Sequence, residues 1–347
     1  MSNFKTIPAG RRLRVLQAGC GDMAQAWVER ALRMNEVEIV GLADVKREAA
    51  ERTARRFNLP ASIIHNSVRD AIKAVQPDAV FDVTVPAAHC GVTLDALKSG
   101  CHVLGEKPLS DNMPCARKMC AAARKHKRLF AVTQNRRYNE HAAAFREGLK
   151  RGMIGELSSL DADFYLGPHF EGFRRAMPHV LLLDMAIHTF DQARMLSGCD
   201  PIAAYCREYN PHGSWFKSAA AAVCIFEMTR GVIFSYRGSW AAEGFPTSWE
   251  SQWRANGSKG SIVWDGASRP RAQISGGGGF QREALDTEIP AVPLLHSGHE
   301  GALHDFVNAL RSGLDPACVC HDNIKSLAMC FAAIESNKSG KRVKVKL

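Results

Sequence analysis

Three ionisable residues stand at helical spacing inside an otherwise apolar stretch of this sequence. Asp184 and His188 are four residues apart, and Asp191 lies seven residues after Asp184. On an α-helix, residues at these spacings project from one face. The residues around them, from Leu181 to Phe190, are mainly apolar, so these groups should be largely buried. Buried ionisable groups are costly unless they are paired or used, and the pattern therefore indicates either an acid–base site or a structural pair satisfied by hydrogen bonds.

A second candidate site is the glycine-rich turn at residues 19–24, Gly-Cys-Gly-Asp-Met-Ala. It follows the apolar run at 13–18 and opens a helix-compatible stretch, the context in which Gly-x-Gly-x-x-Ala binds a dinucleotide. Gly19 would permit the tight turn, Gly21 would let the backbone approach a pyrophosphate, and Ala24 would allow close packing of the helix on the strand. The cofactor contacts expected from this turn are Gly19, Gly21, Asp22, Met23 and Ala24.

An acidic residue completes the nucleotide pattern. Asp44 follows Ala24 by twenty residues, at the end of the second apolar run, where a carboxylate would bind the adenosine ribose hydroxyls. Its charge would repel a 2′-phosphate, which favours NAD. Lys46 and Arg47 follow closely and could offset that repulsion, so NADP remains an alternative.

The elements that must position these residues divide the chain in two. Short apolar runs alternate with amphipathic stretches up to about residue 134, which predicts a doubly wound parallel sheet. The predicted strands of this half are residues 13–18, 38–43, 79–85, 102–104 and 129–133. Beyond residue 155 the pattern is β-rich with a hairpin near 228–231, interrupted by a helix at 178–196 and closed by helices near 300–310 and 323–336. We therefore expect an α/β protein with a dinucleotide-binding domain at 1–135 and a substrate-binding domain at 136–347, whose last helices could pack back on the first.

Composition excludes several classes of protein. The 347 residues are 46% hydrophobic and 23% charged, as in an ordinary globular chain. Lys and Arg exceed Asp and Glu by 45 to 35, but the excess is diffuse and its basic runs lack interleaved aromatics, so no nucleic-acid partner is expected. No apolar run reaches the ~20 residues of a membrane span, and the first eight residues lack the apolar core of a secretory signal. Eleven scattered cysteines fit reduced thiols in a cytoplasm.

Two groups of residues superficially suggest a metal site. One is Cys318, Cys320 and His321 with Cys330, and the other is His296, His299 and His304. Neither has the paired Cys-x-x-Cys spacing of a structural zinc site, so no metal is expected.

Four further segments carry a family resemblance. They are Val-Thr-Val-Pro-Ala-Ala-His at 83–89, Gly-Glu-Lys-Pro at 105–108, Gln-Asn-Arg-Arg-Tyr at 134–138, and the Asp-x-x-x-His-x-x-Asp stretch at 184–191. With the glycine-rich turn they resemble the glucose-fructose oxidoreductase / inositol dehydrogenase / rhizopine-catabolism (Gfo/Idh/MocA) family in order and spacing.

The resemblance implies a Rossmann domain, a C-terminal α/β domain with a large open and mostly antiparallel sheet that commonly forms oligomer contacts, and NAD(P)-dependent chemistry on sugars and cyclitols. It further implies a catalytic set of Lys107, Asp184 and His188. The segments beside the nicotinamide add expected cofactor contacts at Thr84, Pro86, His89, Glu106 and Lys107. A homo-oligomer, dimer or tetramer, is expected.

Hydride departure from a carbinol carbon leaves a hydroxyl proton to be removed. His188 suits this base role because histidine ionises near pH 6.5, while Lys107 would stabilise the developing alkoxide and Asp184 would orient the substrate. Lys107 as the base is the competing assignment. Arg136 and Tyr138, with Arg137 between them, could bind a polyol together with the catalytic set, or form salt bridges at the domain junction.

The expected function is hydride transfer between a sugar or cyclitol hydroxyl and nicotinamide. Two alternatives use the same scaffold: a glycoside hydrolase that uses NAD transiently, and a non-catalytic dinucleotide-binding regulatory protein.

Overall fold

The structure of this chain is a computed structural model that describes residues 3–280 and 282–347. Met1 and Ser2, part of the N-terminal stretch considered above for a secretory signal, lie outside the described residues. The chain divides into two units. The first comprises Met1–Asn135 and Gly298–Ile324, and the second comprises Arg136–Ser297 and Lys325–Leu347.

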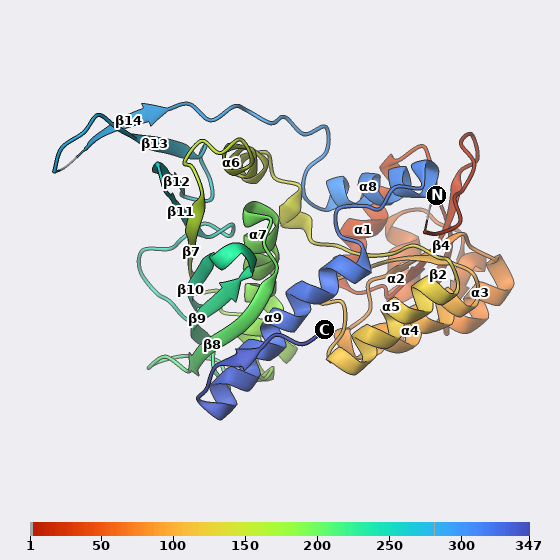
Figure 1. Cartoon of the computed structure of the whole chain (residues 1–347). Coiled ribbons are helices and arrows are strands. Elements are labelled where there is room, and N and C mark those ends of the chain that lie inside the picture. Colours follow the sequence, from red (N-terminus) through yellow and green to blue (C-terminus); the bar gives the residue numbers. More distant parts are fainter. Residues whose placement is uncertain (1–2, 281) are drawn as a thin grey trace. The chain divides into compact units, whose positions relative to one another are not determined.

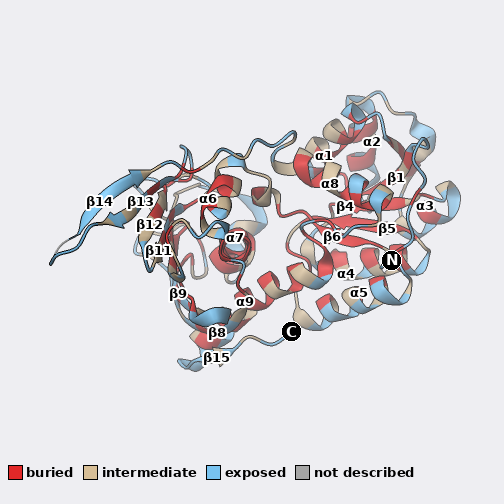
Figure 2. Ribbon diagram, turned by 45° about the horizontal axis from the view of Figure 1, so that its top comes forward, coloured by how far each residue is buried: buried red, intermediate tan, exposed pale blue. Residues whose placement is uncertain are grey.

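A parallel sheet forms the centre of the first unit. Its strands, among the described residues, are β1 (Leu13–Ala18), β2 (Val37–Ala43), β3 (Ile64–His65), β4 (Ala79–Asp82), β5 (His102–Gly105) and β6 (Phe130–Val132). They lie in the order β3-β2-β1-β4-β5-β6, and each pairing is parallel (Figure 1). The central strands are buried along nearly their whole length (Figure 2), as expected for a sheet covered on both faces. This confirms the predicted doubly wound Rossmann arrangement.

Helices connect these strands. They are α1 (Asp22–Arg33), α2 (Arg47–Arg56), α3 (Val68–Val75), α4 (Pro86–Lys98) and α5 (Met113–Lys125). Ser67 caps α3 by accepting from the Asp70 N–H at 3.2 Å, and Asn112 caps α5 by accepting from the Cys115 N–H at 2.8 Å. The prediction of a strand over residues 79–85 was wrong at its end: β4 ends at Asp82, and Pro86 is the first residue of α4. Proline is tolerated there because the first helical N–H has no intrahelical partner.

A segment from late in the chain completes the core of the first unit. Helix α8 (Gly298–Ser312) buries Leu303 and Phe306, and the Phe306 ring meets the Phe81 ring of β4 edge-on at 6.2 Å. The Ile7 N–H donates to the Leu310 carbonyl, and the Val132 N–H donates to the Cys318 carbonyl. Residues 298–324, which the sequence analysis placed in the second domain with the option of packing back, therefore belong to the first unit.

The second unit is built on a larger sheet. Its described strands are β7 (Leu157–Tyr165), β8 (Pro201–Tyr209), β9 (Ala221–Met228), β10 (Ile233–Ser239), β11 (Gln252–Gly257), β12 (Gly260–Trp264), β13 (Arg271–Gly276), β14 (Glu283–Thr287) and β15 (Val343–Lys344). Their order is β14-β13-β12-β11-β7-β10-β9-β8-β15. Only β10 and β7 pair in parallel among these strands; the other pairings are antiparallel. The mostly antiparallel sheet implied by the resemblance is confirmed.

The helices of the second unit lie on this sheet. They are α6 (Glu140–Lys150), a π-helical turn (Leu181–Ala186) that continues into α7 (Ile187–Ser197), and the greater part of α9 (Cys320–Ser339). Every residue of α7 is buried. The single α-helix predicted at 178–196 thus begins with a wider π turn. No helix among the described residues is long and apolar enough to cross a membrane.

Candidate functional site

The glycine-rich turn has the geometry of an anion-binding helix N-terminus. Gly19 has φ +83°, and a Cβ there would lie 2.5 Å from the Val83 carbonyl oxygen, so only glycine fits. Gly21 is the N-cap residue of α1, and a Cβ built on it would meet nothing within 4 Å. Ala24 is fully buried against the sheet, while Asp22 and Met23 are exposed. The open space at Gly21 and the N–H groups of α1 fit a pyrophosphate.

Asp44 is fixed beside this turn by backbone donors. Its Oδ2 accepts from the Cys20 N–H at 2.8 Å, and its Oδ1 accepts from the Lys46 N–H at 2.8 Å. The carboxylate is therefore held at the end of β2, next to the turn that would bind the phosphates. This position suits a ribose contact of NAD.

Asp82, which the sequence analysis did not single out, organises the segment after β4. Its carboxylate is fully buried and accepts from the Thr84 Oγ1–H at 2.6 Å and the Thr93 Oγ1–H at 3.0 Å. His89 Nδ1 lies 3.6 Å from the same carboxylate, and His89 is only 2% exposed. The structure thus places His89 in the packing of α4 on β4, where it has almost no surface for a cofactor, whereas Thr84 and Pro86 are partly exposed.

Glu106 and Lys107 follow β5, and the Lys107–Pro108 peptide bond is cis. Glu106 is buried, and its carboxylate accepts from the Trp27 Nε1–H at 2.8 Å and from the Lys107 backbone N–H at 3.0 Å. Nε2 of His299 lies 3.4 Å from Glu106 Oε1. Lys107 is partly exposed. Glu106 is thus enclosed by protein groups, which suits a role in fixing the turn at Lys107 better than direct contact with the cofactor.

In the second unit, Asp184 lies in the π turn and His188 in the first turn of α7, and both are buried. The Arg174 Nε–H donates to Asp184 Oδ2 at 2.6 Å. The Arg174 guanidinium also lies over the rings of Phe170 and Phe173, at 5.3 and 4.8 Å from their centroids. A guanidinium held this close orients the Asp184 carboxylate. Arg174 was not predicted from the sequence, because nothing in the spacing of residues 174 and 184 points to a contact.

Arg136 and Tyr138 begin the second unit. Arg136 is buried, with Nε 3.7 Å from Glu250 Oε1, and its Nη2–H donates to Met185 Sδ at 3.5 Å. Burial lowers the pKa of Arg136 and raises the pKa of Glu250, although each charge favours the other. Tyr138 is half-buried. Arg136 therefore supports the π turn through Met185, and Glu250 is a second polar residue near this turn that the sequence did not reveal.

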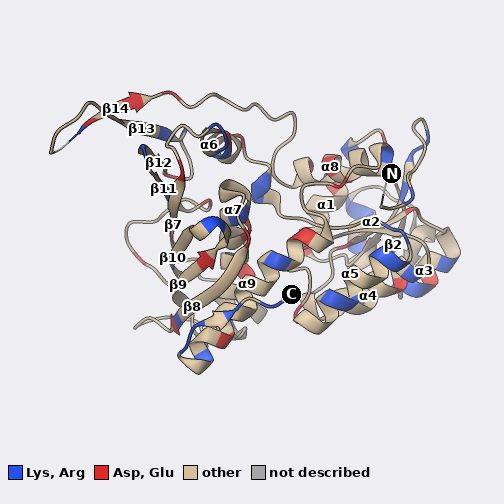
Figure 3. Ribbon diagram, viewed as in Figure 1, with Lys and Arg blue, Asp and Glu red and all other residues tan. Residues whose placement is uncertain are grey.

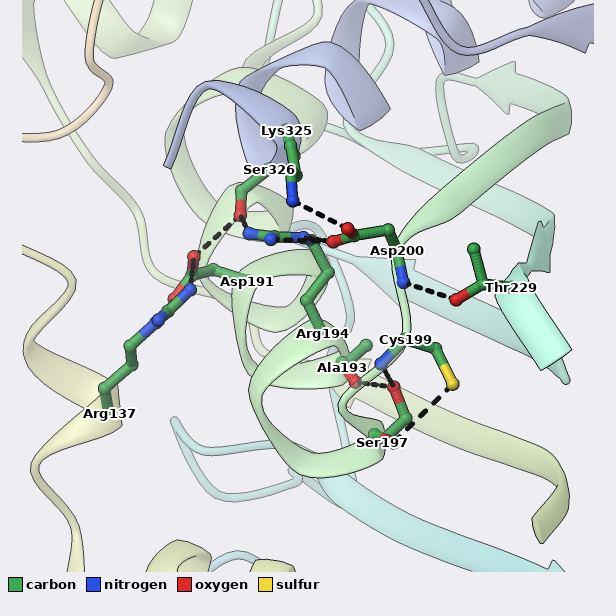
Figure 4. Close-up of polar contacts among 10 residues, drawn as sticks. All are labelled: Arg137, Asp191, Ala193, Arg194, Ser197, Cys199, Asp200, Thr229, Lys325 and Ser326. Carbon is green, nitrogen blue, oxygen red and sulfur yellow. Dashed lines mark hydrogen bonds and ion pairs between the residues drawn. The ribbon is translucent and has the colours of Figure 1, made fainter. Parts of the chain in front are cut away.

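Asp191 has a structural role. Arg137 donates to its carboxylate through Nε at 2.6 Å and Nη2 at 2.8 Å, and the Ser326 Oγ–H donates to it at 2.7 Å (Figure 4). The same network continues through Arg194 to Asp200, whose Oδ2 accepts from the Lys325 Nζ–H at 2.6 Å. Burial acts to raise the pKa of Asp200, but Lys325 and Arg194 lower it below its ordinary value. The helical spacing that groups Asp191 with Asp184 and His188 is therefore misleading.

Two of the residues weighed above for metal binding, His296 and His304, lie with Glu300 so that one ligand atom from each of the three is within 4.8 Å of the others. His299 lies beside Glu106, and His321 lies 3.5 Å from Asp315. His304 lies 4.0 Å from Glu300 on α8, an imidazole and a carboxylate of the kinds that bind divalent ions. The absence of a metal site stays a prediction.

Comparison with known proteins identifies the class. Residues 13–134 match the model of an "Oxidoreductase family, NAD-binding Rossmann fold", and residues 142–263 match the "GFO/IDH/MocA C-terminal domain". The chain belongs to this Gfo/Idh/MocA family of oxidoreductases and binds NAD.

Individual relatives match along nearly the whole chain. The 1,5-anhydro-D-fructose reductase of Ensifer adhaerens is 24% identical, over 94% of this chain and 97% of its own. Inositol 2-dehydrogenase of Rhizobium meliloti is 21% identical, over 94% of this chain and 97% of its own. A crystal structure of an oxidoreductase from Agrobacterium radiobacter in complex with NAD+, L-tartaric acid and magnesium has a TM-score of 0.83 at 20% identity, covering 96% of this chain and 98% of that one, and it shows the shared fold.

Proposed function

We propose that this NAD-dependent oxidoreductase transfers a hydride between nicotinamide and a secondary alcohol, or a ring hemiacetal hydroxyl, of a monosaccharide or cyclitol. The observation that carries the proposal is the buried Asp184 carboxylate, held by the partly exposed Arg174 one helical turn before His188, in a chain whose nucleotide turn fits NAD. The relatives named as an anhydrofructose reductase and an inositol dehydrogenase support a polyol as the substrate class.

The contacts of Asp184 bear on its role. A carboxylate that already accepts a charge-assisted hydrogen bond from Arg174 at 2.6 Å is a weak proton acceptor. We therefore assign Asp184 to orienting the substrate. The removal of the hydroxyl proton then falls to His188, with Lys107 as the alternative base.

Lys107 has a different task in this proposal. It follows β5 at the carboxyl edge of a parallel sheet, the edge at which open α/β sheets bind their ligands. An ammonium there would donate to the substrate oxygen and stabilise the charge that develops as the proton leaves. Bound NAD would supply the hydride acceptor. The residues of this chain that would hold NAD are the turn at 19–24 and Asp44, with Thr84 and Pro86 beside it.

The test is a screen of the purified protein against free sugars and cyclitols with NAD+ and with NADP+, followed by the absorbance of the reduced nicotinamide. We expect net NADH formation with at least one polyol, and a preference for NAD+ because the Asp44 carboxylate would repel a ribose 2′-phosphate. Release of an aglycone from glycosides without net NADH would instead indicate the hydrolase alternative. Binding of NADH without turnover of any polyol would indicate a regulatory protein.

We also propose that the chain forms a homo-oligomer through the outer face of the nine-stranded sheet. Tyr205 of β8 lies directly opposite Ile225 of β9, and both are exposed, at 43% and 44%. Val223 of β9 is also exposed, at 43%, and shares the face of Ile225 because residues two apart on a strand point the same way. Adjacent exposed apolar side chains on a sheet support a buried interface.

The proposed cellular location is the cytoplasm, with a small molecule and a second copy of the chain as the partners. All eleven cysteines, which lie within the described residues, are free thiols, and a reducing compartment would keep them so. Lys and Arg residues occur on helices of both units (Figure 3), in keeping with the diffuse charge of the sequence.

A further inference from the structure

Glu106 is a buried anion directly before Lys107. It is 8% exposed, and two N–H donors, from Trp27 and from the Lys107 backbone, satisfy part of its carboxylate. Neither donor carries a charge. The side chains beside it that can carry a positive charge are His299, whose Nε2 lies 3.4 Å from Glu106 Oε1, and Lys107 itself.

This carboxylate needs a counter-ion, because an isolated charge in a protein interior is strongly unfavourable. Burial acts to raise the pKa of Glu106, but the hydrogen bond and charge of His299, followed by Lys107 and Trp27, outweigh burial and hold the pKa below its ordinary value. Glu106 is therefore ionised, and two groups can neutralise it: the His299 imidazolium or the Lys107 ammonium.

The structure points to His299 as a positioning residue for Lys107. His299 acts as the counter-ion of Glu106, so the Lys107 ammonium does not have to pair with that carboxylate. Lys107 can then donate a hydrogen bond to the substrate oxygen. The inference rests on the role proposed above for Lys107. It gives His299, weighed in the sequence only as a metal ligand, a function in the same reaction.

The fold places His299 firmly enough for this task. His299 is in the first turn of α8, and the next turns of that helix bury Leu303 and Phe306 in the core of the first unit. Phe306 meets Phe81 of β4, the strand next to β5, which leads into Glu106. The imidazole and the carboxylate therefore come from elements that are packed against one core.

The direction of the effect follows from charge. When His299 is protonated, its charge compensates the Glu106 carboxylate. Without that cation, the uncompensated carboxylate attracts the Lys107 ammonium, raises the pKa of the amine and draws Nζ toward itself. If His299 had only a structural role, its substitution would change the stability of the protein but not the pH midpoint of the Lys107 reaction.

The decisive variant is His299→Gln, which removes the charge and keeps a hydrogen-bond donor of similar reach. The matched control is His321→Gln, which removes an imidazole 3.5 Å from Asp315 at an exposed position of the same unit. The readout is the pH dependence of Lys107 acetylation by acetic anhydride, measured by mass spectrometry of the full chain, together with NADH binding by fluorescence. We expect the midpoint for Lys107 to rise by about one pH unit in His299→Gln and to stay in place in the control, with NADH affinity within about twofold.

A second variant tests the same link from the other side. Glu106→Gln removes the anion and should lower the Lys107 midpoint, and adding His299→Gln to it should then have little further effect. Glu106→Gln also tests the inference if the His299→Gln protein does not fold. An unchanged Lys107 titration in both single variants, or independent shifts that add in the double variant, would overturn the inference.

Kinetics give a further readout. With a polyol that the unmodified chain oxidises, His299→Gln should lower kcat about tenfold and change KM less than about threefold, because substrate binding does not require the charge. Failure of the unmodified chain to oxidise any polyol would count against the proposed function alone, since the acetylation measurement needs no turnover.

Discussion

At the scale of single residues, each unit pairs a hydrogen-bonded carboxylate with a side chain that is able to transfer a proton. In the second unit the Arg174 guanidinium donates to Asp184, and in the first unit Trp27 donates to Glu106 while His299 lies beside it. Two carboxylates are thereby removed from the list of possible bases. The proton transfer of the proposed reaction is left to an imidazole and an amine.

We expect His188→Ala and Lys107→Ala each to lower turnover by about two to four decades, since each removes a group that acts on the reacting hydroxyl. NADH should still bind, because the nucleotide turn is untouched. The measurement is kcat with a responsive polyol, alongside NADH fluorescence. Substitution of the exposed His212 by alanine is the control and should leave kcat unchanged. Normal turnover in His188→Ala would exclude it as the base.

At the scale of elements, α7 depends on polar contacts as well as apolar ones. Its Asp191 and Arg194 lie on a helix that is buried throughout, and they contact Arg137 and Ser326 (Figure 4). These bonds tie α7 to α9 and to the segment that starts the second unit. The helix that carries His188 is thus held by a network of charges in which each member has a partner.

Asp191→Asn should destabilise the second unit by about 3 kcal/mol, because it leaves the guanidinium of Arg137 buried without its counter-charge. The measurement is thermal or denaturant unfolding. The control is Asp95→Asn, which breaks the pair between the exposed Arg69 and the partly exposed Asp95 and should change stability far less. Equal losses in the two variants would show that the network does not support α7.

The same elements show what the sequence was able to predict. Strand β1, the glycine-rich turn and the run of parallel strands follow from local apolar patterns, and Gly19 and Asp44 lie where those patterns place them. The π turn at Asp184 and the pairing of Asp191 with Arg137 could not be predicted, because α-helical spacing is assumed when faces are assigned. Partners far apart in the sequence, such as Glu106 and His299, have no local pattern at all.

At the scale of the whole molecule, the outer face of the nine-stranded sheet decides the proposed assembly. Ile225→Lys combined with Tyr205→Glu should shift the chain toward the monomer in sedimentation or size-exclusion measurements, because charged side chains would be buried at the contact. Leu314→Lys, at an exposed apolar position of the first unit, is the control and should leave the assembly unchanged. An unaltered oligomer in the double variant would mean that another surface is used.

The placement of α8 also has a consequence for synthesis. Phe306, which closes the core over Phe81, is translated long after the strands that it covers. The nucleotide-binding unit is therefore unable to finish folding while the middle of the chain is emerging from the ribosome, and its apolar surface stays open until α8 arrives. A nascent chain halted before residue 298 should be captured by chaperones, whereas the full-length chain should not.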